Sequence, residues 1–295
     1  MTTATASIPV STTVKELVSL AKPRVSSLVI LTAAAGIGLS PGRMGALAAT
    51  VMLLSTVLVV AGANVLNCWM ERESDRLMAR TRTRALPDGR LDAQLALVFG
   101  LALSAVSLPA LYLLINPVTA VLAAVALLTY VLVYTPLKSV TPTALIIGAV
   151  PGALPPLMGW TAVTGEIQAG GLVLFGILFL WQMPHVIGLS CYRALEYEAA
   201  GIKALPAVRG MVVAKRHAVA WGVLLLPVSL LPVPLGFGGP IYLVAGGLLS
   251  LTYLAAALYG YRSDPGPVWG RRLFLVSLVY LPVLFALLML DPGGA

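Results

Sequence analysis

Nine long apolar runs constrain this chain more than any other feature. Each is close to the roughly 20 residues that an α-helix needs to cross the hydrocarbon core of a bilayer. They lie at about 18–40, 45–68, 93–115, 118–136, 142–162, 170–192, 215–234, 239–260 and 271–290. The runs are too long for transmembrane strands, and they do not alternate as such strands do. The sequence therefore predicts an all-α, polytopic membrane bundle of nine transmembrane helices around a central cavity.

The composition agrees with a membrane protein. Of the 295 residues, 59% are hydrophobic and 10% are charged, whereas soluble domains carry about 25% charged residues. Only Asn116-Pro117 separates the third run from the fourth, so the pattern allows eight or nine helices. We expect one membrane domain over residues 1–295, with residues 1–14 as a flexible tail.

The basic residues predict how the helices cross the membrane. The net charge is +8, and of 19 Lys and Arg only Arg43 lies in a connection on the opposite face from the rest. The positive-inside rule then places the N-terminus and every even-numbered connection in the cytoplasm. The N-terminus lacks the features of a cleaved signal or a transit peptide, which predicts a multi-pass protein of the inner (plasma) membrane. These charges flank membrane spans, so they indicate contact with lipid and not with nucleic acid.

Four polar side chains form a stripe where the second run ends. Asn64, Asn67, Glu71 and Asp75 fall within an arc of roughly 80° on a helix, at about 100° per residue. Carboxylates at the end of a membrane segment are costly unless they face a polar cavity or a partner. Two carboxylates and two amides near a cluster of arginines therefore predict a site for a divalent cation and a phosphate-bearing ligand.

A simpler interpretation of this stripe is that its acids form ordinary ion pairs along the helix. Glu71 and Asp75 have Arg72, Arg76 and Arg80 within reach at the spacing of neighbours on a helix surface. Spacing alone does not separate the two interpretations.

The sixth connection carries a second polar cluster. Trp181, Tyr192 and Glu196 lie within about 40° of His185 if the helix continues. Glu196 is therefore a better candidate ligand than Glu198, which points to the far side. Glu196 lies about 17 Å from His185 along the helix axis, so these two residues need not contact the same group.

A diphosphate requires direct basic contacts as well as a cation, because of its large negative charge. Five basic residues close to the polar clusters meet this need: Lys22, Arg24, Arg80, Arg84 and Lys138. Mg²⁺ prefers carboxylates together with phosphate oxygens and water, which predicts Mg²⁺ as the cofactor. Neither Cys68 nor Cys191 is expected to form a disulfide in a reducing compartment.

These segments together resemble the UbiA-type intramembrane prenyltransferases, and among them the haem-directed members. The resemblance covers nearly the whole chain. It rests on AKPRV (21–25), NCWMERESDRLMARTRTRALPDGR (67–90), YTPLKSVTP (134–142), GALPPLMGWTAVTG (152–165), WQMPHVIGLSCYRALEYEAAGIKALP (181–206) and RRLFLVSLVYLPVLF (271–285). The most specific parts are the N-x-x-x-E-R-x-x-D run and W-Q-x-P-H. Quinone-directed relatives usually carry a fuller N-D-x-x-D-x-x-x-D pattern.

The resemblance implies a role for each candidate residue. The expected metal ligands are Asn67, Glu71, Asp75 and Glu196, and the same four with His185 are the expected catalytic residues. The expected substrate contacts are Lys22, Arg24, Asn64, Arg80, Arg84, Tyr134, Lys138, Tyr192 and Arg193. Two departures fall in the motifs: Cys68 stands where many relatives have Asp, and Leu195-Glu196-Tyr197 replaces the usual D-D-Y.

The implied reaction transfers a farnesyl group from farnesyl pyrophosphate to a vinyl group of haem B, with Mg²⁺ assisting departure of the pyrophosphate. Haem-handling or oxidase-assembly proteins are the implied partners. Two other functions stay open. One is a prenyltransferase that acts on a quinone precursor or another aromatic acceptor. The other is a transporter or lipid-binding protein, although the charged clusters lie at one face of the membrane and not at its midplane.

Overall fold

The computed structural model describes residues 10–79, 81–262 and 266–293, and this part of the chain is helical without strands. Within it, eight helices are long and apolar enough to cross a bilayer. They are α3 (Ala46–Met70), α5 (Ala93–Leu114), the continuous helix Pro117–Leu137, α8 (Ala144–Thr164), α9 (Ala169–Tyr192), α12 (Met211–Leu230), α13 (Pro240–Arg262) and α14 (Pro267–Leu290). The continuous helix contains α6 (Pro117–Leu128), a π-helical segment (Thr129–Tyr134) and α7 (Thr135–Leu137).

The first predicted run differs from the other eight in length. It folds as α2 (Pro23–Leu39), which has 17 residues and is shorter than the eight long helices. Proline at the start sets its first turn. Each of the nine predicted runs therefore corresponds to a helix in the described chain, eight of them long enough to span by themselves. The predicted break between the third and fourth runs is confirmed, because Asn116 caps α6 by accepting a hydrogen bond from the Thr119 N–H at 2.9 Å.

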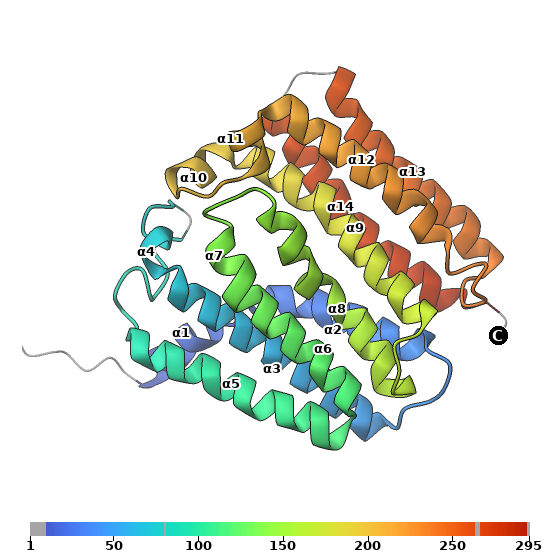
Figure 1. Cartoon of the computed structure of the whole chain (residues 1–295), viewed down its shortest axis with the longest axis horizontal. Helices are drawn as coiled ribbons and strands as arrows, with labels where there is room; N and C mark the ends of the chain where they lie inside the picture. The colour runs from blue at the N-terminus through green and yellow to red at the C-terminus, as the bar shows by residue number, and fades with distance from the viewer. Residues whose placement is uncertain (1–9, 80, 263–265, 294–295) are drawn as a thin grey trace, which may run out of the picture.

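Four short helices lie outside the spans. They are α1 (Val10–Leu20), α4 (Arg72–Asp75), α10 (Ala194–Ala199) and α11 (Leu205–Arg209). Figure 1 shows α4, α10 and α11 at the same end of the bundle as α7. The polar connections predicted to carry function therefore meet at one end. Residues 10–14 of the predicted tail belong to α1, and residues 1–9 lie outside the described chain.

Arg90 ties α1 to the second connection. Its guanidinium pairs with Glu16 of α1, donates to the Asp88 carboxylate at 2.6 Å and donates to the Thr83 carbonyl at 2.8 Å. Hydrogen bonds to Asp88 and Glu16 raise the pKa of Arg90 above its ordinary value. The charge is therefore permanent, and it fixes the loop that follows α4.

Two glycines allow α2 and α8 to pack closely. A Cβ at Gly36 would lie 2.1 Å from the Pro156 carbonyl oxygen, and one at Gly159 would lie 2.0 Å from the Ala33 carbonyl oxygen. Any larger residue would force the two backbones apart. Small residues that let helices approach are common in membrane bundles. Here they set the position of α8, which forms one wall of the inner cavity described below.

Asp291 closes the end of the bundle opposite α4. Its carboxylate accepts a hydrogen bond from the Tyr242 N–H at 2.8 Å, and its carbonyl accepts one from the Gly239 N–H at 2.8 Å. The first turn of α13 is thus capped from the end of α14. We expect Asp291→Ala to lower stability by about 0.5–2 kcal/mol. Thermal unfolding in detergent should show a drop in Tm for Asp291→Ala and a smaller one for Asp291→Asn, which keeps the acceptor; equal Tm values for Ala and wild type would contradict the capping role.

Candidate active site

A polar cavity of about 270 Å³ lies where α3, α4 and α7 meet the sixth connection. We call it the outer cavity. Its lining includes seven of the predicted site residues: Lys22, Asn67, Glu71, Asp75, Arg84, Tyr134 and Lys138. The sixth connection contributes Tyr197, Ile202 and Lys203. The structure therefore brings the first acidic motif and most of the predicted basic residues into one site.

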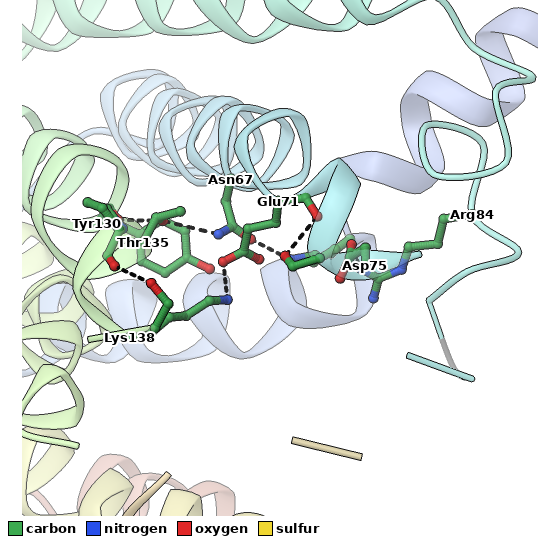
Figure 2. A network of polar contacts seen from close by, with 11 residues as sticks. Asn67, Glu71, Asp75, Arg84, Tyr130, Thr135 and Lys138 are labelled. Atoms are coloured by element: carbon green, nitrogen blue, oxygen red, sulfur yellow. Dashed lines mark hydrogen bonds and ion pairs between the residues drawn. The ribbon is translucent and has the colours of Figure 1, made fainter. Parts of the chain in front are cut away.

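The end of α3 positions Asn67 and Glu71. The helix closes at Glu71, whose backbone N–H still donates to the Asn67 carbonyl at 3.0 Å. The buried Oε1 of the Glu71 carboxylate forms an ion pair with the Lys138 ammonium. Figure 2 shows this pair beside Asn67. The carboxylate thus has an oxygen whose charge is balanced only by one movable side chain.

The short helix α4 positions Asp75. This side chain is buried, with 6% of the residue exposed, and its Oδ2 accepts a hydrogen bond from Arg84 Nη1 at 3.1 Å. The Thr81 hydroxyl donates to the Asp75 carbonyl at 2.8 Å and holds the turn that follows. Figure 2 shows the Asp75 carboxylate and Arg84 on the side of Glu71 away from Lys138. The two acidic groups are therefore neighbours along the cavity wall, with one basic group on either side of them.

Lys22 enters the cavity from a strained turn. It has φ +53° and is the one described residue other than glycine with a positive φ. This left-handed conformation costs on the order of 1–3 kcal/mol for a residue with a side chain. The turn directs its Nζ to Asn67 Oδ1 at 3.4 Å. Strain of this kind is common at binding sites, where neighbouring contacts maintain it.

A π-helical segment supplies the wall opposite α3. Asn67 Nδ2 donates to the Thr135 hydroxyl at 3.1 Å, and this hydroxyl donates to the Tyr130 carbonyl at 2.8 Å. The Lys138 ammonium lies 5.9 Å from the ring centroid of Tyr134, within the range of a cation–π contact. Short π-helical segments often occur at functional sites. This one presents the rings of Tyr130 and Tyr134 to the outer cavity, and Lys138 lies one turn beyond it.

A second, more apolar cavity of about 490 Å³ lies deeper in the bundle. We call it the inner cavity. Tyr130, Tyr134, Leu145 and Val186 line both cavities, so the two adjoin. Two predicted site residues, Asn64 and His185, line the inner cavity and not the outer one. A ligand with a charged head and an apolar tail would match this arrangement of polar mouth and apolar interior.

The structure does not bring three predicted residues of the sixth connection into either cavity. Glu196 pairs with Arg193 at 2.9 Å, and Tyr192 lies between the guanidinium groups of Arg193 and Arg271. None of Tyr192, Arg193 and Glu196 lines the two cavities. The physical reason is a break at Arg193 (φ −113°, ψ 28°) between α9 and α10, which turns Tyr197 toward the outer cavity instead.

Two further predicted contacts cannot be placed. Arg80 and the side chain of Arg24 lie outside the described residues.

The simpler interpretation of the acidic stripe was that Glu71 and Asp75 pair with arginines along the helix, and Arg72 and Arg76 can be compared with it. Glu73 pairs with both Arg72 and Arg76, whereas the acids of the stripe pair with Lys138 and Arg84 across the cavity.

The sequence analysis did not single out Tyr130 and Lys203, which line the outer cavity, or Thr135, which accepts the hydrogen bond from Asn67. A weak signal existed for Tyr130, which precedes Tyr134 by one helical turn. Lys203 reaches the site because its backbone N–H donates to the Lys138 carbonyl at 3.0 Å. That contact joins the fourth connection to the sixth, and no local pattern in the sequence indicates it.

The outer cavity has the donor set that Mg²⁺ prefers. Asn67, Glu71 and Asp75 offer hard oxygen atoms along one wall, and the buried Glu71 Oε1, which pairs with Lys138, is a candidate ligand atom. The described residues contain no group of three or more His, Cys, Asp or Glu placed to hold a metal ion. Mg²⁺ is commonly held by one or two carboxylates together with substrate phosphates, so these residues fit a metal that binds with its ligand.

Comparisons with known proteins agree with this fold. A model of the UbiA prenyltransferase family matches residues 29–279. Among solved structures, the chain superimposes on digeranylgeranylglyceryl phosphate synthase with a TM-score of 0.80 at 19% identity, covering 95% of this chain and 98% of that one. It also superimposes on a UbiA homolog from Archaeoglobus fulgidus bound to DMAPP and Mg²⁺, with a TM-score of 0.69 at 18% identity and coverage of 92% and 99%.

The chain belongs to the UbiA prenyltransferase family, a class of intramembrane enzymes. Its sequence is similar to particular members. It is 52% identical over 280 residues to the protoheme IX farnesyltransferase of Myxococcus xanthus, covering 95% of both chains. It is 40% identical over 286 residues to the protein of the same name from Brucella anthropi, covering 95% of this chain and 91% of that one. The predicted family is therefore confirmed.

Proposed function

We propose that this protein transfers a farnesyl group from farnesyl diphosphate to a vinyl group of haem B. One observation carries the proposal. An outer cavity with paired acids and bases adjoins an apolar inner cavity in the bilayer-spanning bundle. That arrangement fits a prenyl diphosphate whose reacting carbon lies between a charged head and an apolar chain. High identity to proteins named protoheme IX farnesyltransferase supports haem B as the acceptor.

The residues of the outer cavity would promote departure of the diphosphate. Asn67, Glu71 and Asp75 would hold Mg²⁺, which when bound would neutralise charge on the diphosphate oxygens. Lys22, Lys138 and Arg84 would stabilise the negative charge that develops as the bond between oxygen and the allylic carbon breaks. Such groups act most strongly where water is excluded. They come from three separate segments of the chain: the turn before α2, the loop after α4 and the residue after α7.

The inner cavity would protect the allylic cation that remains. Its walls are mainly apolar and include Val59, Leu127 and Leu178. They would keep water from the cation until the haem vinyl group attacks it. The electron pair of the vinyl group then forms the new carbon–carbon bond. A water molecule adds afterwards to the haem side of that bond and loses a proton, giving a hydroxyethylfarnesyl chain.

The direct test is an assay of purified protein with labelled farnesyl diphosphate, Mg²⁺ and haem B. We expect a farnesylated haem as the product. A parallel reaction offers 4-hydroxybenzoate, an acceptor of the quinone-precursor type. Prenylation of the benzoate without any of the haem would overturn the proposal.

Removal of divalent metal should abolish most of the activity. We expect excess EDTA to lower turnover by at least about 100-fold, because the diphosphate would leave without its main charge neutralisation. Added Mg²⁺ should restore the original rate. The same preparation, assayed for thermal unfolding with and without EDTA, would show whether the fold itself needs the metal. Undiminished turnover in EDTA would rule out this role for Mg²⁺.

Glu196 was predicted as a metal ligand, and a matched pair of variants tests it. In the described arrangement its carboxylate pairs with Arg193 outside the outer cavity. We therefore expect Glu196→Gln to lower turnover by about threefold or less, in keeping with the small energy of a partly exposed ion pair. Glu198→Gln, an exposed neighbour, serves as the control. A 100-fold loss of turnover in Glu196→Gln, without such a loss in Glu198→Gln, would support Glu196 as a metal ligand.

The other sequence-based expectations form part of the proposal. We propose a single membrane domain over residues 1–295, located in the inner membrane with the N-terminus and the outer cavity at the cytoplasmic side. The asymmetry of Lys and Arg supports this orientation. A cytoplasmic cavity mouth would give a water-soluble diphosphate head access to the site. Haem-handling or oxidase-assembly proteins remain the proposed partners.

A further inference from the structure

The ring of His185 is held on three sides in the inner cavity. It stacks against Trp181 with ring centroids 4.8 Å apart, and it packs against Phe274 of α14 at the same centroid distance. Its Nδ1 lies 2.6 Å from the hydroxyl of Ser277, also on α14. Trp181 is itself fixed, because its indole N–H donates to the Ser277 carbonyl at 2.9 Å. The imidazole therefore has one defined orientation.

The hydroxyl of Ser277 determines which nitrogen of His185 carries the proton. This hydroxyl has a single proton, and we assign that proton to the contact with the Phe274 carbonyl at 2.5 Å, because the carbonyl oxygen can only accept. It can then only accept from the imidazole. Nδ1 is consequently the protonated nitrogen, and Nε2 carries the lone pair. Ser277 is completely buried, so water does not compete for this contact.

The lone pair of Nε2 is available to a ligand. His185 lines the inner cavity, and within the described chain its Nε2 has no hydrogen-bond partner. With both ring faces and Nδ1 occupied, the remaining edge of the ring is the part that meets the cavity. Two other polar side chains of this cavity are already engaged: Gln182 donates to the Ala149 carbonyl at 2.7 Å, and Asn64 donates to the Ala21 carbonyl at 3.4 Å.

We infer that His185 binds the iron of the haem substrate through Nε2, with Ser277 as the residue that positions it. The inference rests on the proposed function, which brings haem B into the inner cavity. A neutral imidazole whose second nitrogen donates to a fixed acceptor is the usual form of a metal-binding histidine. Histidine is also a common axial ligand of haem iron. Coordination fixes the porphyrin relative to α9, and thereby selects which edge of the haem faces the reacting carbon.

The chain contains two histidines, which gives a matched control. His217 is an exposed residue of α12 that does not line the inner cavity. The experiment titrates haem B into detergent-purified wild type, His185→Ala, Ser277→Ala and His217→Ala. Absorption spectra report the affinity and the iron environment. Resonance Raman spectra of the ferrous complexes report the iron–imidazole stretching band directly.

We expect this band in wild type and His217→Ala and its loss in His185→Ala. Added imidazole should restore the wild-type spectrum of His185→Ala, which also shows that the variant is folded. Ser277→Ala should keep the band at a shifted frequency, and bind haem about 10–100-fold more weakly, because the ring loses its positioning partner. Identical spectra and affinities for wild type and His185→Ala would overturn the inference, as would loss of the band in His217→Ala alone.

Farnesyl transfer measured on the same samples separates this inference from the proposed function. Wild type that forms farnesylated haem but shows no change on His185→Ala substitution would keep the function and reject the iron ligand. Wild type that shows the imidazole band but forms no product would keep the ligand and reject the transfer reaction.

Discussion

Asp75→Asn should lower turnover in farnesyl transfer by about 10²–10³-fold, the usual loss when one group that stabilises developing charge is removed. Asparagine keeps the size of the side chain and an oxygen that can still accept from Arg84. What it lacks is the negative charge that would hold Mg²⁺ in the outer cavity. Glu71→Gln should behave in the same way. Both variants should require higher Mg²⁺ for half-maximal rate, which a titration of the rate against Mg²⁺ would measure.

The chain offers a control on the same short segment. Glu73 lies between the two acids in sequence, but its side chain is 65% exposed and pairs with Arg72 and Arg76. Glu73→Gln should therefore keep turnover within about threefold of wild type, because surface ion pairs contribute little. Equal losses for Glu73→Gln and Asp75→Asn would show that the segment needs acidic character in general. They would contradict a metal site built on specific carboxylates.

The apolar runs predicted the helices well, because a span of about 20 apolar residues has few alternatives in a bilayer. The first run was less well predicted. Lys22-Pro23 divides it into α1 and α2, since a residue before proline is disfavoured in the helical conformation and Lys22 takes up φ +53°. Both residues were visible in AKPRV, so this boundary was predictable from the sequence in principle.

The predicted site residues share a cavity where the helix continues and do not where it breaks. Asn67, Glu71 and Asp75 reach one cavity although α3 ends at Met70, because α4 begins directly afterwards. A similar extension of α9 placed Glu196 on the stripe of His185. The break at Arg193 changes the direction in which the side chains of the following turn point. As a result Tyr197, and not Glu196, lines the outer cavity.

Long-range contacts were beyond the reach of sequence patterns. The partner of His185 is Ser277, 92 residues later in the chain. Helical periodicity relates residues within one element only. Which helix faces which depends on side-chain packing between elements, as the glycine contacts of α2 and α8 show. The ion pair of Glu71 with Lys138 is a second example, since it joins the second connection to the fourth.

Lys138→Met should lower turnover by about 10²–10³-fold and also destabilise the protein. The ammonium has two roles in succession. Without ligand it neutralises Glu71, and with ligand it would bind the diphosphate while Mg²⁺ takes its place beside the carboxylate. Methionine leaves Glu71 buried without a counter-charge. A fully buried pair broken in this way costs about 3–5 kcal/mol, and here we expect about 1–3 kcal/mol because the lysine side chain remains 21% exposed.

A double variant separates the two roles. Glu71→Gln with Lys138→Met removes both charges, so thermal stability should return close to the wild-type value. Turnover should not recover, because the diphosphate still lacks its basic contact and the metal lacks a carboxylate. Thermal unfolding and the farnesyl transfer rate are measured on all four proteins of the cycle. If the double variant regained activity along with stability, the pair would serve only to hold α3 against α7, and neither residue would act on the substrate.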